Sequence, residues 1–371
     1  MARLCGVLVF LFWRSAANGQ DDPERLLRSA IALQQAGDIE RAIPQYRAYL
    51  KLRPDAVEPR SNLGVALARS GRYNEAITEY REALRRRPGD PTIRLNLALA
   101  LYHLAQFTDA ASELSSLHKE QPANQQVILL LADCWLRKGE NRRVIDMLSL
   151  IESSNQGDLA IAYLLGMALL RDNQVDRGQS IIDRILRNGD SAEARLLLGT
   201  AKLTAQDYDG AIADLRQAAE LNSQLRDVHS YLGQAYIQTG DTAEARSAFQ
   251  KELALNPNDF ESNLQLGALL KQDQDFDGAR LLLQKALLVR PGDLRTRYQL
   301  ASVNLAAGKL DEARLGFEAI LRQAPQFVEA HISLATAYYR LNRKADGDRE
   351  KALAQKLTLE QRTKPSQEKM E

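Results

Sequence analysis

The sequence predicts an all-α fold, a solenoid of about ten stacked helix hairpins, and three observations predict it. A small residue recurs every 34 positions, with one interval of 33 between Gly166 and Gly199. Each repeat contains two apolar stretches with helical spacing, and a turn separates them. Leucine precedes the recurring small residue in every repeat after the first, and the small residues are Ala30, Gly64, Ala98, Ala132, Gly166, Gly199, Gly233, Gly267, Ala301 and Ala335.

Three further columns of residues repeat in the same register. A second small column lies twelve residues after the first, at Ala42, Ala76, Ala110, Val144, Gly178, Ala211, Ala245, Ala279, Ala313 and Gly347. Large apolar residues form another column, at Tyr46, Tyr80, Leu114, Leu148, Ile182, Leu215, Phe249, Leu283 and Phe317. Proline closes six repeats, at Pro54, Pro88, Pro122, Pro257, Pro291 and Pro325. We expect the small residues where helix backbones approach closely, and the large ones to fill the space between successive hairpins. One hairpin cannot bury its apolar face alone, so the hairpins must stack.

The chain resembles the tetratricopeptide repeat (TPR) family in its period, the Leu-Gly/Ala pair, the turn glycines, the paired alanines and the closing prolines. The resemblance covers residues 23–361. It implies a right-handed superhelix in which the first helix of each hairpin lines a concave groove. It also implies that this groove binds a peptide or protein partner and that the fold carries no chemistry of its own.

The same resemblance places a set of polar and aromatic residues on the groove-facing first helices. Asn62 and Asn96 occupy equivalent positions in adjacent repeats, and their amides could hold the backbone of an extended peptide. The lysines of the carboxylate-clamp members are absent beside them. An alternative is that these polar groups form only a solvated inner face. The predicted groove residues are Arg28, Asn62, Asn96, Asp133, Arg137, Tyr163, Arg171, Tyr231, Gln234, Gln265, Tyr298, Gln299, Tyr339 and Arg340.

Residues 1–19 have the pattern of a signal peptide. Arg3 precedes an apolar run at residues 4–13, and small residues follow, so cleavage is expected after Ala17 or Gly19. The run is too short to span a bilayer as a helix. A cleaved leader predicts export to the periplasm or the extracellular space. The alternative is a mis-assigned start or an uncleaved leader, which would leave the chain in the cytoplasm.

The remaining chain divides by how well the repeat pattern is kept. Well-formed repeats cover residues 23–140 and 192–361, the latter ending in a charged capping helix, and residues 362–371 are expected to be disordered. Between them, residues 141–191 lack the closing prolines and carry Val144 and Gly178 in the second small column. This degenerate stretch is either a softer joint between two lobes or the result of ordinary drift.

Composition and motifs give no sign of catalysis or of a cofactor. The formal net charge is +1, from 49 basic and 48 acidic residues, which gives no reason to expect nucleic acid as a partner. The four histidines have no metal-ligand spacing, and no phosphate-binding or nucleophile motif is present. Of the two cysteines, Cys134 lies in an apolar stretch and is expected to be a buried structural thiol.

These observations favour a non-catalytic scaffold that binds a peptide or protein in its concave groove. The leader favours export, and envelope assembly or secretion is the setting that the family resemblance implies. The alternatives are an intracellular adaptor and a regulatory or substrate-presenting subunit of a separately encoded enzyme. No stable membrane span, metal or cofactor is expected.

Overall fold

The computed structural model describes residues 22–154, 158–187 and 189–363, and this part of the chain contains twenty α-helices and no strand. The predicted all-α fold is therefore confirmed. None of the described helices is both long enough and apolar enough to cross a membrane. The predicted signal peptide lies outside the described residues, and so do residues 364–371 of the predicted disordered tail. The prediction is wrong for residues 362 and 363, which are the last residues of α20.

The helices fall into two compact units, divided between Leu104 and Ala105. The first unit contains α1 (Pro23–Gln35), α2 (Ile39–Leu52), α3 (Val57–Arg69), α4 (Tyr73–Arg86) and α5 (Pro91–His103). The second begins with α6 (Phe107–Glu120), α7 (Gln125–Lys138), α8 (Asn141–Ser154), α9 (Leu159–Arg171), α10 (Val175–Leu186), α11 (Ala192–Thr204), α12 (Tyr208–Leu221) and α13 (Val228–Thr239). It continues with α14 (Thr242–Leu255), α15 (Phe260–Gln272), α16 (Phe276–Val289), α17 (Leu294–Ala306), α18 (Leu310–Gln323), α19 (Val328–Arg340) and α20 (Lys344–Thr363).

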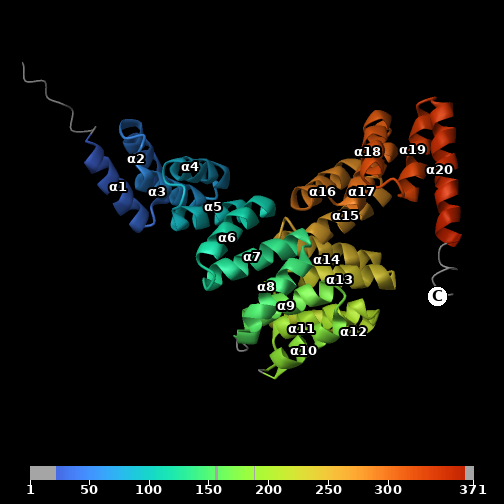
Figure 1. The fold of residues 1–371 in the computed structure, drawn as a ribbon, viewed down its shortest axis with the longest axis horizontal. Helices are drawn as coiled ribbons and strands as arrows, with labels where there is room; N and C mark the ends of the chain where they lie inside the picture. The colour runs from blue at the N-terminus through green and yellow to red at the C-terminus, as the bar shows by residue number, and fades with distance from the viewer. Residues whose placement is uncertain (1–21, 155–157, 188, 364–371) are drawn as a thin grey trace, which may run out of the picture. The chain divides into compact units, whose positions relative to one another are not determined.

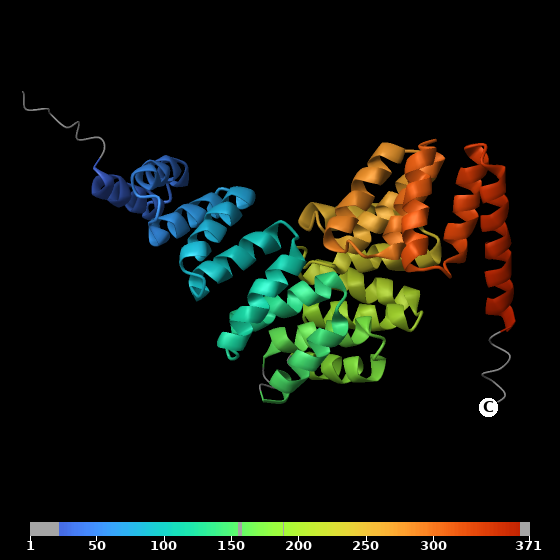
Figure 2. The ribbon, with the colours of Figure 1, turned by 45° about the horizontal axis from the view of Figure 1, so that its top comes forward.

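Within each unit, the two helices of a predicted hairpin pack against each other, and each hairpin packs against the next (Figure 1; Figure 2). The odd-numbered helices are the predicted first helices of the repeats, and the even-numbered helices are the second ones. The predicted joint at residues 141–191 lies inside the second unit. Whether this stretch opens more readily than its neighbours stays a prediction.

The turn inside each hairpin contains one residue in the left-handed conformation. Gly71 has φ +75°, and the equivalent Ala105 and Gln206 have φ 57° and 63° although they are not glycine. A left-handed residue other than glycine costs roughly 1–2 kcal/mol, so the packing of the two helices imposes the turn where the sequence lacks glycine. The full set of turn residues is Gly37, Gly71, Ala105, Gly139, Asn173, Gln206, Gly240, Gln274, Gly308 and Asn342.

Aspartate begins many of the first helices. Asp90, for example, accepts hydrogen bonds from the backbone N–H groups of Thr92 and Ile93 at 3.0 and 3.1 Å. Such a cap satisfies amide groups that have no partner inside the helix and contributes about 1 kcal/mol. The same arrangement occurs at Asp22, Asp158, Asp259 and Asp293.

The small and large columns pack against each other within one hairpin. A Cβ atom on Gly64 would lie 2.5 Å from the ring of Tyr80, and one on Gly233 would lie 2.4 Å from the ring of Phe249. Tyr80 and Phe249 are completely or almost completely buried. The small residue on the first helix therefore makes room for the large residue of the second helix in the same hairpin. Our expectation that the small column marks close backbones was incomplete in this respect.

The degenerate middle is part of a continuous core. One cluster of buried apolar residues extends from Ile128 to Leu269 and includes Val144 and Leu148. Gly178 faces Leu170, where a Cβ would come within 2.7 Å of a side-chain methyl group. Among the described residues of 141–191, the core therefore continues although the repeat pattern is lost.

Candidate partner-binding groove

The second unit contains a cavity of about 510 Å³ that is lined mainly by first helices. Side chains from α7, α9, α11, α13 and α15 form most of its wall, and the end of α16 completes it. Four of the predicted groove residues line this cavity, namely Arg137, Arg171, Tyr231 and Gln234. The cavity is therefore the place where the predicted groove residues of this unit come together.

Asp227 joins two arginines at the wall of the cavity. It lies just before α13 and is only 8% exposed. Its carboxylate accepts hydrogen bonds from Arg137 of α7 at 3.0 Å and from Arg171 of α9 at 3.2 Å. Burial alone would raise the pKa of Asp227, but the two guanidinium groups outweigh burial and hold this pKa below its ordinary value. Asp227 thus connects helices that lie two and three hairpins apart along the chain.

Tyr231 supports the same cluster from α13. Its hydroxyl accepts a hydrogen bond from Nε of Arg171 at 2.8 Å, and the guanidinium carbon of Arg171 lies 5.8 Å from the centre of the tyrosine ring. Tyr231 is buried, and burial raises its pKa. Burial and the charge of Asp227 also raise the pKa of Tyr163 on α9. Replacing Tyr231 would therefore disturb the packing of Arg171 as well as any contact with a partner.

Glu252 of α14 binds the backbone of Asp227. It is completely buried, and one of its carboxyl oxygens accepts the backbone N–H of Asp227 at 2.9 Å. Its other oxygen has no hydrogen-bond partner in the described part of the chain. Burial, reinforced by the negative charges of Asp227 and Asp259, raises the pKa of Glu252 to about 8. Glu252 is therefore a neutral carboxylic acid at neutral pH.

Asp259 caps α15 and reaches the cavity wall. It accepts hydrogen bonds from the hydroxyl of Ser230 at 2.9 Å and from the backbone N–H of Ser262 at 2.8 Å. Burial and the negative charge of Asp227 raise the pKa of Asp259. Its carboxylate therefore binds groups of α15 and α13.

Arg290, the residue directly after α16, is an arginine of the cavity without a carboxylate partner in the described chain. Its Nε donates to the backbone carbonyl of Arg137 at 2.9 Å, and its guanidinium carbon lies 4.0 Å from the centre of the Phe260 ring. Gly139 leaves room for it, since a Cβ there would lie 3.4 Å from the guanidinium carbon. Within the described residues, the two terminal nitrogens of Arg290 make no hydrogen bond or ion pair.

The acidic residues near Arg290 are held by other donors. Glu261 is 2.5 Å from the guanidinium of Arg295. Asp293 accepts from the backbone and the hydroxyl of Thr296 at 2.7 and 2.6 Å. Burial and the positive charge of Arg171 lower the pKa of Arg290, although an arginine remains protonated at physiological pH. Among the described residues, the cavity therefore contains a half-buried cation, Arg290, whose charge is not directly paired.

The remaining predicted groove residues lie elsewhere. Asp133 forms an ion pair with Arg137 at 3.4 Å, and Gln265 donates to Glu261 at 2.6 Å. The hydroxyl of Tyr298 lies 3.1 Å from that of Ser333, between two hairpins. Arg28, Asn62 and Asn96 belong to the first unit, Gln299 is half-buried on α17, and Tyr339 and Arg340 are exposed on α19.

Sequence reasoning missed the three acidic residues and the arginine that organise the cavity. Asp227 and Asp259 lie in turns between repeats, and Glu252 lies on a second helix. Arg290 precedes a closing proline, where a basic residue is expected to stabilise a helix end. The 34-residue period describes neighbouring hairpins and carries no signal for contacts between α7, α13 and α16.

Cys134 is buried, as expected, and burial raises its pKa to about 12, which is typical of an inert thiol. Among the residues that the structure describes, no group of histidine, cysteine, aspartate or glutamate could hold a metal ion.

Comparisons with protein families match residues 27–326 to tetratricopeptide repeat profiles and to an ARM repeat profile from a tetratricopeptide repeat protein. Profiles of the tetratricopeptide repeat match residues 27–91 and 231–294, and another such profile matches residues 270–326. A profile of the N-terminal ARM repeat of tetratricopeptide repeat protein 21 matches residues 67–251. A comparison with curated proteins finds no match.

Solved structures share the fold at low sequence identity. A crystal structure of the APC/C hetero-tetramer Cut9-Hcn1 is 13% identical and has a TM-score of 0.55, and the match covers 91% of this chain and 88% of that one. A crystal structure of MamA is 22% identical with a TM-score of 0.41, covering 44% of this chain and 96% of MamA. MamA from Desulfovibrio magneticus RS-1 is 21% identical with a TM-score of 0.43, covering 47% and 98%. The likeness to Cut9-Hcn1 agrees with a superhelical solenoid and says nothing about the partner.

Proposed function

We propose that this chain, which belongs to the tetratricopeptide repeat family, is a scaffold that holds an acidic segment of a partner protein in the cavity around Arg290. Repeats of this family present extended concave surfaces to other proteins. The cavity is the part of that surface where this chain concentrates buried charge.

The observation that carries the proposal is the state of Arg290. Its guanidinium lies over the ring of Phe260, it lines the cavity, and its terminal nitrogens bind no carboxylate of the described chain. A planar guanidinium of this kind can bind a carboxylate through two parallel hydrogen bonds. An aspartate, a glutamate or a C-terminal carboxylate of a partner would supply the missing charge.

Other residues of the wall suit a peptide. Gln234 is half-buried on α13, and its amide donates only weakly to the carbonyl of Ser230, at 3.4 Å. Thr204 on α11 also lines the cavity. An amide and a hydroxyl can each donate and accept, as the backbone of an extended segment requires.

The binding proposal is tested with a displayed library of random dodecapeptides, selected on the full chain. We expect the selected peptides to be rich in aspartate and glutamate. We expect Arg290→Gln to weaken their binding by about tenfold or more, because a hydrogen bond to a charged group contributes about 1.5–3 kcal/mol. Affinity is measured by fluorescence anisotropy.

Arg322→Gln is the matched control, because Arg322 is exposed on α18 and does not line the cavity. Circular dichroism must show that both variants are folded. Selected peptides without acidic residues, or equal affinity for the wild type and Arg290→Gln, would contradict the assignment of the cavity.

We propose also that the scaffold works outside the cytoplasm, in envelope assembly or secretion. The support is the pattern of residues 1–19, a basic residue followed by an apolar run and small residues. Mass spectrometry of the chain purified from fractionated native cells should find a mature N-terminus directly after Ala17 or Gly19. An intact N-terminus in the cytosolic fraction would favour the intracellular adaptor.

A further inference from the structure

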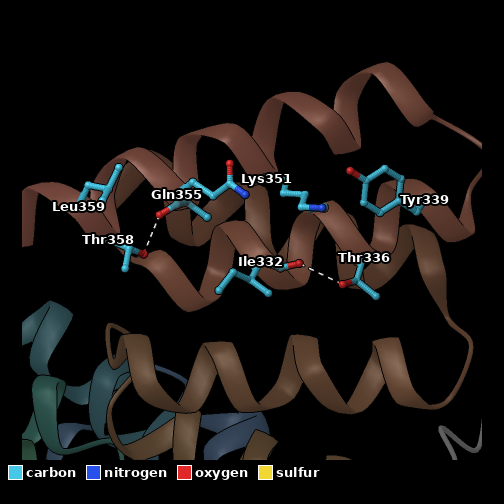
Figure 3. Close-up of a pocket in the computed structure, with 9 residues that line it drawn as sticks. Ile332, Thr336, Tyr339, Lys351, Gln355, Thr358 and Leu359 are labelled. Atoms are coloured by element: carbon cyan, nitrogen blue, oxygen red, sulfur yellow. Dashed lines mark hydrogen bonds between the residues drawn. The ribbon is translucent and has the colours of Figure 1, made fainter.

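We propose that the last hairpin binds an amphipathic helix of a partner protein, with an acidic side chain of that helix placed against Lys351. A groove of about 660 Å³ lies between α19 and α20, and Figure 3 shows the side chains that line it. Ile332 of α19 is 53% exposed there, and Leu359 of α20 is 62% exposed. This site is separate from the cavity around Arg290 and does not depend on the proposed function.

The preceding hairpin shows what normally fills such a groove. Tyr298 of α17 occupies the position 34 residues before Ile332. Its ring lies 5.3 Å from that of Phe327, which precedes α19, and its hydroxyl lies 3.1 Å from that of Ser333 in α19. The groove of α17 and α18 is therefore covered by the next first helix. One hairpin earlier still, the equivalent Leu264 is only 2% exposed.

Lys351 replaces the large apolar residue of the repeat. The equivalent residue of the preceding hairpin is Phe317, which is completely buried, and the same column is apolar in all nine earlier repeats. Lys351 lines the groove and makes no hydrogen bond or ion pair with the described residues. A helix that covers this groove as α19 covers the previous one would bring its apolar face over Ile332, and an acidic residue would be needed opposite Lys351.

A simple solubility cap would not look like this. A capping helix is expected to present polar residues at the positions that a further repeat would cover. Here Lys351, Gln355 and two threonines share the groove with Ile332 and Leu359, which are large, apolar and exposed. The second helix α20 is also longer than its counterparts, at 20 residues against 14 in α18, and Leu359 lies in its last part. The groove therefore suits an amphipathic surface, with apolar side chains over Ile332 and Leu359 and polar ones opposite Lys351.

A second copy of this chain is a poorer occupant than a partner helix. The first helix α1 is the element that a second copy would offer if the solenoid were continued. None of its large apolar side chains is among the strongly exposed ones of the described chain. Its exposed side chains carry mixed charge, with Glu24 acidic and Arg25 and Arg28 basic, and none of them is a large apolar side chain that could cover Ile332. A helix with an acidic residue within its apolar face fits better.

The experiment uses a displayed library of helical peptides based on residues 326–341, the segment that covers the previous groove, randomised on its apolar face. Peptides are selected on the full chain. We expect the selected peptides to carry aspartate or glutamate at one randomised position. Ile332→Ser or Leu359→Ser should each weaken binding about tenfold, as for a central apolar contact of an interface. Lys351→Glu should change the selected residue to lysine or arginine.

Leu281→Ser is the control, because Leu281 is 55% exposed on α16 and does not line the groove. The proposal is overturned if binding of the selected peptides does not depend on Ile332 and Leu359, or if Lys351→Glu leaves the preferred charge unchanged. Sedimentation of the chain without peptide measures whether the chain self-associates. Self-association that is lost in Ile332→Ser would assign the groove to a second copy.

Discussion

Replacing Asp227 with glycine is expected to lower the free energy of unfolding of the second unit by about 3–5 kcal/mol, because it leaves two buried guanidinium groups without their shared carboxylate. Arg137 and Arg171 both bind Asp227, and their side chains are only 13% and 23% exposed. Urea unfolding followed by tryptophan fluorescence measures the effect, since Trp135 lies on α7, the helix that carries Arg137.

Glycine is chosen because Asp227 has φ +72°, where alanine would add strain of its own. Asp227→Asn keeps a hydrogen-bond acceptor and removes only the charge, so it should lie between the wild type and Asp227→Gly. Asp277→Gly is the control, because Asp277 is an exposed partner of Arg280. A wild-type unfolding midpoint for Asp227→Gly would show that the cluster does not hold the unit together.

Raising the pH from about 5 to above 8 is expected to destabilise the second unit through Glu252. Its pKa is about 8 in the folded chain, against an ordinary value of 4.5. Between these values the folded state binds one more proton than the unfolded state, so stability falls as pH rises. The loss is about 1.4 kcal/mol per pH unit and on the order of 5 kcal/mol in total. It is complete above the folded pKa and absent below the unfolded one.

Glu252→Gln isolates this effect, because the neutral amide resembles the protonated acid and can still accept the N–H of Asp227. The variant should be more stable than the wild type at pH 8.5 and lack the decline. Burial lowers the pKa of His229, which therefore destabilises the fold at acid pH in both proteins, so the difference between them reports Glu252. Parallel pH profiles for the two proteins would contradict the assignment.

Most of the fold could be predicted because the same helix contacts and turns recur in each repeat. The leucine and small columns mark the contacts within a hairpin, and the turn glycines mark where the chain reverses. Ala105 and Gln206 show the limit, because there the left-handed turn is imposed by packing and not by the residue type. The small residues make room for a large ring, such as that of Tyr80 or Phe249. This could be seen only from the side-chain positions.

The candidate site could be predicted only in part. Arg137 and Arg171 lie on first helices, as the family pattern implies, and they do line the cavity. Tyr298 lies on a first helix too, but its ring packs between hairpins against Phe317 and Phe327. Arg290 joins the cavity through a contact with Arg137, which is four hairpins away in sequence. Such contacts depend on the path of the superhelix, and the 34-residue period does not encode that path.

The most direct test of the scaffold assignment is photo-cross-linking of a selected acidic peptide to the full chain, with a photoreactive phenylalanine derivative at Gln234 or at Leu281. Gln234 lines the cavity, whereas Leu281 is exposed on α16 outside it. We expect a cross-link at position 234 that Arg290→Gln strongly reduces, and none at position 281. Cross-linking at position 281 with none at 234 would place the partner outside the cavity and overturn the assignment of the binding site.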